Sequence, residues 1–292
     1  MRISSFRAIG SLLLAALAAG LAQPAAAQST ITDTPSALSP PGANDWSCKP
    51  SAAHPRPVVL VHGVWSDMLV SWLPLSPLLV GKGYCVFALN YGAGTSGVNG
   101  TAPMEQSAQE LANFVGEVLA ATKATQVDIV GHSEGALMPR WYLKYLNGAT
   151  QVHSLIGLAP PNHGTDVDGL ITLGESLPVV GKLVQQGFAS WCPACIEFIT
   201  GSLGDSFLAT LNGGGDTVPG VQYTVIMSDV DLVVTPYTSG FLSGPGVTNI
   251  TLQKQCILDP SNHVTEPYDF IALHDVLNAL DPDHATPVGC FG

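Results

Sequence analysis

The sequence predicts an α/β fold with a mostly parallel central sheet, helices on both faces of the sheet and a small helical cap inserted in the second half of the chain. Short, unbroken apolar runs alternate with segments of helical periodicity, which is typical of βαβ units. The runs lack polar alternation, as expected for strands that helices cover on both sides. The 292 residues are enough for one large domain or two small ones.

Strands are expected at 57–61, 84–90, 126–130, 154–159, 221–227 and 247–253, and helices at 72–83, 102–123, 136–146 and 266–280. The helix at 102–123 has the clearest apolar stripe, formed by Met104, Ala108, Leu111, Val115 and Val118. Pro139 should kink or loosen the helix at 136–146, because proline lacks a backbone donor. Residues 161–218 break the alternation and are interpreted as a helical cap or lid insertion within one domain that spans 48–292.

The first 27 residues have the features of a secretory signal peptide. Arg2 and Arg7 precede the apolar run "IGSLLLAALAAGLA", and small residues follow it up to Ala27. We expect cleavage near Ala27 and a secreted protein. Residues 28–47 are rich in Ser, Thr, Pro and Ala, and are expected to form a flexible N-terminal arm.

Composition excludes several function classes. The formal net charge is −12, and removal of residues 1–27 makes it about −14. A chain this acidic is unsuited to nucleic acid or to strongly anionic membranes. No later segment reaches about 18 apolar residues, so no stable membrane insertion is expected. No His, Cys, Asp or Glu cluster has convincing metal-ligand spacing, so neither a metal nor a cofactor is expected.

All six cysteines lie beyond the expected signal peptide. An even number in an exported chain favours disulfides, and six cysteines allow fifteen connectivities. We favour Cys48–Cys85, Cys192–Cys195 and Cys256–Cys290, because the predicted fold could bring each pair together. The "CPAC" stretch at 192–195 is interpreted as a structural loop rather than a redox motif, since no thioredoxin-like segment surrounds it.

The stretch "GHSEG" at 131–135 matches the G-x-S-x-G pattern of a nucleophile elbow. A buried strand is expected before it and a helix after it, and so tight a turn leaves room only for glycine on either side of Ser133. The alternative is that Ser133 simply caps a helix. The context favours a nucleophile.

A nucleophilic serine needs a base and an orienting acid, which in this fold class follow it in the order Ser, acid, His. His263 lies on a loop after the last predicted strand and fits that order. Asp229 and Asp231 both follow the fifth predicted strand; Asp231 is preferred, but chain order alone cannot choose between them.

Cleavage of an acyl bond also needs donors for an oxyanion. The backbone N–H of Glu134, the residue after the serine, is one candidate. The N–H of Val64, in the loop after the first predicted strand, is the other. His62 in the same loop is interpreted as a structural residue.

With "VVLVHG", "GHSEG", "LAPPNHGT", "DLVVTPY" and "NHVTEPYDFIALHDVLNALDP" in place, residues 48–290 resemble the secreted bacterial triacylglycerol lipases of the α/β-hydrolase fold. The resemblance implies a catalytic triad of Ser133, Asp231 and His263, with Val64 and Glu134 as the oxyanion hole. It also implies cleavage of acylglycerols or other carboxylic esters through an acyl-enzyme. A monomer that meets its substrate as a small molecule or at a lipid–water interface is expected.

Alternative functions remain at this point. "GAGTSG" at 92–97 has the spacing of a dinucleotide fingerprint, but "VNGTAP" separates it from the next helix, so it is interpreted as a loop near the pocket. A polyester depolymerase and an acyltransferase are the alternatives on the same fold. A binding module without activity is the non-enzymatic alternative.

Overall fold

The computed structural model describes residues 38–290 apart from 95, 202, 203 and 205. The expected signal peptide and residues 28–37, half of the expected N-terminal arm, lie outside these residues, so both stay predictions. Within the part of the chain that the structure describes, no helix combines the length and apolarity needed to cross a membrane.

Six parallel strands form one sheet in the order β2-β1-β3-β4-β5-β6. The strands are β1 Val58–Val61, β2 Val86–Leu89, β3 Val127–His132, β4 Val152–Leu158, β5 Gln222–Met227 and β6 Val247–Thr251. All six predicted strands are thus confirmed. Because every strand runs in the same direction, their carboxyl ends meet at one edge, where Val61 pairs with Leu89 on one side and with Gly131 on the other.

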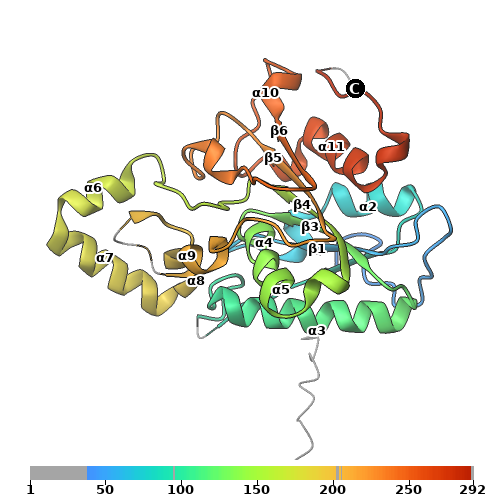
Figure 1. Cartoon of the computed structure of the whole chain (residues 1–292), viewed down its shortest axis with the longest axis horizontal. Helices are drawn as coiled ribbons and strands as arrows, with labels where there is room; N and C mark the ends of the chain where they lie inside the picture. The colour runs from blue at the N-terminus through green and yellow to red at the C-terminus, as the bar shows by residue number, and fades with distance from the viewer. Residues whose placement is uncertain (1–37, 95, 202–203, 205, 291–292) are drawn as a thin grey trace, which may run out of the picture. The chain divides into compact units, whose positions relative to one another are not determined.

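Helices cover both faces of this sheet, as predicted (Figure 1). The α-helices are α1 Met68–Ser71, α2 Leu75–Gly81, α3 Met104–Thr122, α4 Glu134–Leu137, α5 Pro139–Tyr145, α6 Leu170–Ser176, α7 Pro178–Trp191, α8 Pro193–Glu197, α9 Phe207–Asn212, α10 Leu252–Gln255 and α11 Phe270–Leu280. Short 3-10 turns lie at η1 Gly148–Thr150, η3 Tyr237–Gly240, η4 Glu266–Tyr268 and η5 Pro282–His284.

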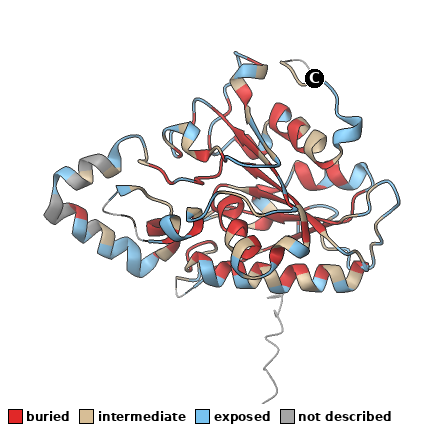
Figure 2. Ribbon diagram, viewed as in Figure 1, coloured by how far each residue is buried: buried red, intermediate tan, exposed pale blue. Residues whose placement is uncertain are grey.

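Alternate strand residues belong to two different apolar cores. Val59 and Val61 pack with α3 and α5, whereas Val58 and Leu60 pack with α2 and α11. β1 and β2 are buried along their whole length and β3 and β4 almost so, and Figure 2 shows the buried residues concentrated in the sheet and on the inner sides of the helices. Double coverage explains why these strands are largely apolar, whereas the edge strand β6 exposes Thr248 and Asn249.

Pro139 marks a helix boundary rather than a kink. The segment predicted at 136–146 divides into α4 and α5, and Pro139 is the first residue of α5. Proline is favoured there because the first N–H groups of a helix have no intrahelical acceptor.

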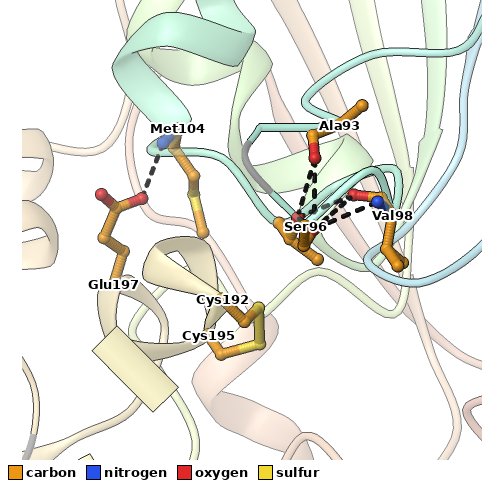
Figure 3. The surroundings of a disulfide bond; sticks show 8 residues. Ala93, Ser96, Val98, Met104, Cys192, Cys195 and Glu197 are labelled. Atoms are coloured by element: carbon orange, nitrogen blue, oxygen red, sulfur yellow. Dashed lines mark hydrogen bonds between the residues drawn. A yellow bond between two sulfur atoms is a disulfide. The ribbon is translucent and has the colours of Figure 1, made fainter. Parts of the chain in front are cut away.

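The three expected disulfides are present. Cys48–Cys85 ties the start of the described chain to β2, and Cys256–Cys290 ties the segment after α10 to the C-terminal residues. Cys192–Cys195 closes the corner between α7 and α8 (Figure 3).

Four helices, α6 to α9, occupy the described part of the insertion between β4 and β5. A buried network attaches this insertion to the rest of the domain. The guanidinium of Arg140 on α5 donates to the Asn212 side chain at 2.7 Å and to the Asp216 carbonyl at 3.1 Å. The guanidinium of Arg140 also donates to the Asn162 carbonyl at 3.3 Å. The insertion is therefore anchored to α5 near both of its ends.

Candidate active site

Ser133 lies in the turn that joins β3 to α4, at the carboxyl edge of the sheet. Its φ of 55° and ψ of −124° are unusual for a residue with a side chain. A Cβ on Gly131 would lie 2.0 Å from the carbonyl oxygen of Gly135, and one on Gly135 would lie 2.1 Å from that of His62. Glycine on both sides is therefore a steric requirement of the turn, as the sequence predicts.

The structure brings Ser133, His263 and Asp231 together. The Oγ of Ser133 lies 3.0 Å from Nε2 of His263, and Nδ1 of His263 lies 2.8 Å from Oδ2 of Asp231. All three residues are buried. With Nδ1 protonated and donating to the carboxylate, Nε2 is left as the acceptor for the serine hydroxyl, which is the arrangement of a general base beside a nucleophile.

The two acid candidates differ in their surroundings. Asp231 is buried, and its Oδ1 accepts the N–H groups of Val233 and Val234 at 2.7 and 2.9 Å. Asp229 is exposed, and its backbone N–H donates to Gln253. Only Asp231 contacts His263, and its carboxylate is fixed by backbone donors that are part of its own loop.

His132, which precedes the serine, holds the backbone of His263. Burial, followed by the charge of His263, lowers the pKa of His132 to about 3, so its ring is neutral. Its Nε2 lies 2.8 Å from the His263 carbonyl oxygen and is the donor in that hydrogen bond. The sequence did not single out this contact, because the two residues are 131 positions apart.

The other histidines have different partners. His153 contacts Asp128 at 3.0 Å, and His163 contacts Asp216 at 3.0 Å. His274 lies on α11 beside Thr286, and His284 pairs with Asp281. None of these four contacts involves Ser133.

The loop that follows β1 lies against the serine. A Cβ on Gly63 would be 3.1 Å from the Cβ of Ser133, so Val64 is next to a residue in contact with the nucleophile. In the described chain, the backbone hydrogen bonds outside regular elements include none donated by the N–H of Val64 or of Glu134. Both groups remain available to an oxyanion.

Residues after β2 support this loop. The carbonyl of Asn99 accepts the Trp65 N–H at 3.0 Å, and its side-chain amide donates to the Ser66 carbonyl at 3.2 Å. Gly100 is packed so closely that a Cβ there would lie 2.8 Å from the Cα of Val64. The described residues of "GAGTSG" lie in a loop that ends before α3, and its continuation supports the 62–66 loop. No signal in the sequence marks Asn99 or Gly100 for this role.

His62 is fully buried and has a structural environment. Burial lowers its pKa to about 4, its Nδ1 lies 2.8 Å from the Gly63 carbonyl, and its ring stacks on Tyr91 at 4.5 Å. A neutral imidazole packed in this way shapes the loop and is not placed beside Ser133 as a second base.

An apolar cavity of about 410 Å³ lies beneath α6 and α7. Its wall includes Leu170, Ile171, Leu177, Phe188 and Ile196, together with Trp65 from the loop after β1. The ring of Trp65 is 5.9 Å from that of Trp191 at the end of α7. The cavity therefore reaches the residue next to Val64. Of the other apolar residues of the insertion, the side chains of Leu173, Val179 and Val180 lie outside the described set.

In the residues that the structure describes, no group of three or more His, Cys, Asp or Glu side chains is arranged to hold a metal ion. The chemical groups at the carboxyl edge of the sheet are a hydroxyl, an imidazole and a carboxylate, hydrogen-bonded in series.

Comparison with known proteins agrees with this geometry. Residues 55–269 match the family described as Lipase (class 2). The chain is 30% identical over 122 residues to a triacylglycerol lipase from Pseudarthrobacter phenanthrenivorans, a stretch covering 39% of this chain and 36% of that protein. The aligned stretch therefore spans about a third of that relative.

Two solved structures share the fold. Lipase B from Aspergillus fumigatus superposes with a TM-score of 0.63 at 21% identity, over 86% of this chain and 56% of that one. The α/β hydrolase domain-containing protein 10 from mouse gives a TM-score of 0.50 at 15% identity, over 80% of this chain and 90% of that one. The parallel sheet with its two helical layers is thus the predicted α/β-hydrolase fold, and the chain belongs to the class 2 lipase family.

Proposed function

We propose that the protein is a secreted serine ester hydrolase, and specifically a triacylglycerol lipase, that works through an acyl-enzyme on Ser133. The observation that carries the proposal is the hydrogen-bonded chain from Ser133 through His263 to Asp231, with distances of 3.0 and 2.8 Å. Family membership and the triacylglycerol lipase activity named for a relative support the same reaction.

In the first half of the reaction, the Oγ of Ser133 attacks the ester carbonyl carbon while Nε2 of His263 takes the hydroxyl proton. The carboxylate of Asp231 orients the imidazole and stabilises its charged form. The N–H groups of Val64 and Glu134 stabilise the oxyanion. His263 then returns the proton to the alkoxide as the C–O bond breaks, and the alcohol leaves.

In the second half, His263 removes a proton from water, and the resulting hydroxide attacks the acyl carbon. Collapse of the second tetrahedral intermediate breaks the bond to Ser133, which recovers its proton from His263. The products are an alcohol and a fatty acid. The protein contributes placement and charge stabilisation, and no group outside the described side chains and N–H donors is needed.

The apolar cavity supports a fatty acyl chain as the acid part of the substrate. Its wall is almost entirely aliphatic and aromatic, and it includes Trp65, the residue after Val64. An acyl chain bound there would point its carbonyl toward the oxyanion donors. The insertion at 161–218 then acts as a cap that supplies most of the binding wall for the chain.

Exposed apolar side chains near the site support a substrate presented at a lipid–water interface. Leu232 follows Asp231, and Val264 follows His263. Ile257 and Leu258 lie on the loop that runs from α10 to His263. The two loops are side by side, because Gln253 accepts from the Asp229 N–H and donates to the Asp259 carbonyl. Exposed apolar groups gathered at one place mark an interaction surface.

Three disulfides among the described residues and the sequence of the first 27 residues support secretion. Expression with the native leader, followed by N-terminal sequencing of the protein in the medium, tests this. A new N-terminus close to residue 28 is expected, and a protein retained in the cell with Met1 intact contradicts secretion.

The experiment that tests the function is hydrolysis of a soluble short-chain chromogenic ester and of a triacylglycerol emulsion. Both activities should disappear in Ser133→Ala, and a phosphonate that reacts with activated serines should label Ser133 alone. Turnover of neither ester by the parent protein contradicts the proposal. Turnover of the short ester and of a polyester film, without release of fatty acid from the emulsion, shifts the assignment to a depolymerase.

A further inference from the structure

Glu134 has a side chain that the reaction above does not use. Its backbone N–H is the proposed oxyanion donor, and its side chain is fully buried. Within the described chain, neither Oε1 nor Oε2 has a hydrogen-bond partner that meets ordinary geometric limits. A buried, charged carboxylate without hydrogen-bond donors would be strongly unfavourable, so the protonation state of the Glu134 side chain needs an explanation.

The Glu134 carboxyl lies against the segment after β2, because a Cβ on Gly100 would be 3.1 Å from its Oε2, and the Gly100 N–H donates to the Tyr91 carbonyl. The phenol of Tyr91 and the carboxyl of Glu134 each affect the pKa of the other. The hydroxyl of Tyr91 already donates to the carbonyl oxygen of His62 at 2.7 Å. A phenol has one proton, so the Oη of Tyr91 can only accept from Glu134. A hydrogen bond between the two therefore requires the proton to be on the Glu134 carboxyl.

A second buried acid acts in the same direction. Oε2 of Glu197, on α8, accepts the N–H of Met104 at 2.7 Å (Figure 3). Met104 is the first residue of the 19-residue helix α3, where a free N–H and the helix dipole favour a carboxylate. Negative charge on Glu197 disfavours a second negative charge on the nearby Glu134.

The pKa of Glu134 agrees with a protonated side chain. Burial, then the charge of Glu197, raises the pKa of Glu134 well above its usual value, and the Tyr91 hydroxyl only partly opposes this. The titratable groups around it are Tyr91 after β2 and Glu197 on α8, and Tyr91 in turn is affected by Glu110 of α3 and stacks on His62. None of these supplies a positive charge.

We propose that Glu134 is a neutral carboxylic acid that donates its proton to Tyr91, and that this bond positions the oxyanion loop through the His62 carbonyl. The hydrogen-bonded series runs from Glu134 to Tyr91 Oη to the His62 carbonyl, two residues before Val64. One residue thus supplies an oxyanion N–H from its backbone and fixes the opposite donor with its side chain. The side chain of Glu134 therefore positions the oxyanion loop and does not react, and this role rests on the proposed function.

Infrared spectroscopy tests the protonation state without using activity. The difference spectrum of the parent minus Glu134→Gln at about pH 7 should contain the C=O stretch of a protonated carboxylic acid. The buried Glu266 and Asp275 are present in both proteins, so their bands cancel. In a Tyr91→Phe background the same band should move, because its acceptor is lost. A difference spectrum with carboxylate bands only overturns the proposal.

Rescue by the isosteric amide tests the positioning role. Glutamine keeps an N–H donor for Tyr91, whereas leucine does not. On a soluble ester, kcat of Glu134→Leu should be about tenfold below that of Glu134→Gln, the rate equivalent of one hydrogen bond, with similar KM. In the Tyr91→Phe background the difference between the Gln and Leu variants should vanish.

Equal kcat values for the Gln and Leu variants overturn the positioning role, as does a difference that persists without the Tyr91 hydroxyl. If Glu134→Leu does not fold, as judged by circular dichroism, Glu134→Met replaces it. Failure of the underlying function is recognised separately, because a parent protein that hydrolyses no ester can still show the protonated band of Glu134.

Discussion

At the scale of single residues, the proposed reaction requires the carboxylate of Asp231 to orient His263 as a base. It accepts Nδ1–H of His263 at 2.8 Å, and two backbone N–H groups hold its other oxygen. In Asp231→Asn, the amide would present a donor to the ring and stabilise the wrong tautomer. We expect kcat to fall about 10⁴-fold, the size found for such changes, with little loss of folding.

The matched control is Asp229→Asn, two positions away on the same loop. Asp229 is exposed and contributes only its backbone N–H to Gln253, so kcat should be unchanged. Steady-state kinetics on a soluble ester and thermal melts of both variants check the prediction. Near-parental turnover by Asp231→Asn would show that the observed hydrogen bond does not orient the base.

A second residue-scale prediction concerns Asp275 on α11. Burial raises the pKa of Asp275 to about 6 from 3.8, although its Oδ1 accepts the Gln255 side-chain N–H at 3.0 Å. Below 3.8 the folded and unfolded chains are both protonated there. Between 3.8 and about 6 only the folded chain keeps the proton. The free energy of unfolding therefore decreases as pH rises through this window.

Asp275→Asn does not titrate and keeps an oxygen acceptor for Gln255. The free energy of unfolding of the variant minus that of the parent should therefore rise with pH, because the parent alone loses stability. The difference should level off above about pH 6, with a total change of at most about 3 kcal/mol. Urea unfolding of both proteins at about pH 4 and about pH 7 measures the change. A difference that is the same at both values contradicts the raised pKa.

Chain order and local context predicted the proposed catalytic residues, and the limits of that method are visible residue by residue. The glycines beside Ser133 were predictable because the turn is local. The choice between Asp229 and Asp231 needed the burial of their loop, which depends on distant segments. The contact of His132 with the His263 carbonyl and the inward carboxyl of Glu134 could not be predicted, because tertiary packing alone creates them.

At the scale of elements, the disulfides differ in the length of chain that they close. Cys48–Cys85 spans 37 positions and Cys192–Cys195 only 3. Chain-entropy estimates give a stabilisation of about 4 kcal/mol for the long loop and about 1.6 kcal/mol for the short one. Replacing Cys48 and Cys85 together by Ala should therefore destabilise the protein more than replacing Cys192 and Cys195.

Urea unfolding of the two double variants, compared with the parent, measures both effects. Paired replacement leaves no free thiol at either site. A larger loss for the Cys192/Cys195 pair would mean that the corner between α7 and α8 stabilises the fold by more than loop closure, for example through the packing of α8 on α3.

The elements themselves were predictable to different degrees. The first four strands and α3 were predicted because apolar runs and a regular apolar stripe reflect burial along most of each segment. β5 and β6 were predicted where the alternation of strands and helices resumes, and β6 exposes Thr248 and Asn249. The helices of the insertion were not resolved individually from the sequence. Among their described residues, α6 and α7 present apolar side chains to a cavity and to solvent, so their periodicity does not define one buried face.

At the scale of the whole molecule, the site exists because parallel strands end at one edge. Ser133 and His263 are 130 positions apart, yet they follow strands whose carboxyl ends share that edge. The sequence predicted this convergence from topology. It did not predict the order β2-β1-β3-β4-β5-β6, because strand order depends on crossovers whose sequences carry no local signal.

Charge and exposed apolar surface together predict which lipid surfaces the molecule prefers. The loops beside the site expose Leu232, Ile257, Leu258 and Val264, while the chain carries a formal net charge of −12. Apolar insertion favours any lipid surface, and the net charge opposes an anionic one. We expect strong binding to triacylglycerol droplets and zwitterionic vesicles with little salt dependence. Binding to anionic vesicles should be weaker at low salt and should increase as salt screens the repulsion.

Co-sedimentation of catalytically inactive Ser133→Ala protein with vesicles of each composition measures the partitioning. Replacing Ile257 and Leu258 together by Ser should reduce binding to every surface, because about 80% or more of each side chain is exposed and available for insertion. Leu38→Ser is the matched control, since Leu38 is 72% exposed but does not belong to these loops. Equal loss in both variants, or tighter binding to anionic vesicles at low salt, would place the lipid-binding surface elsewhere on the molecule.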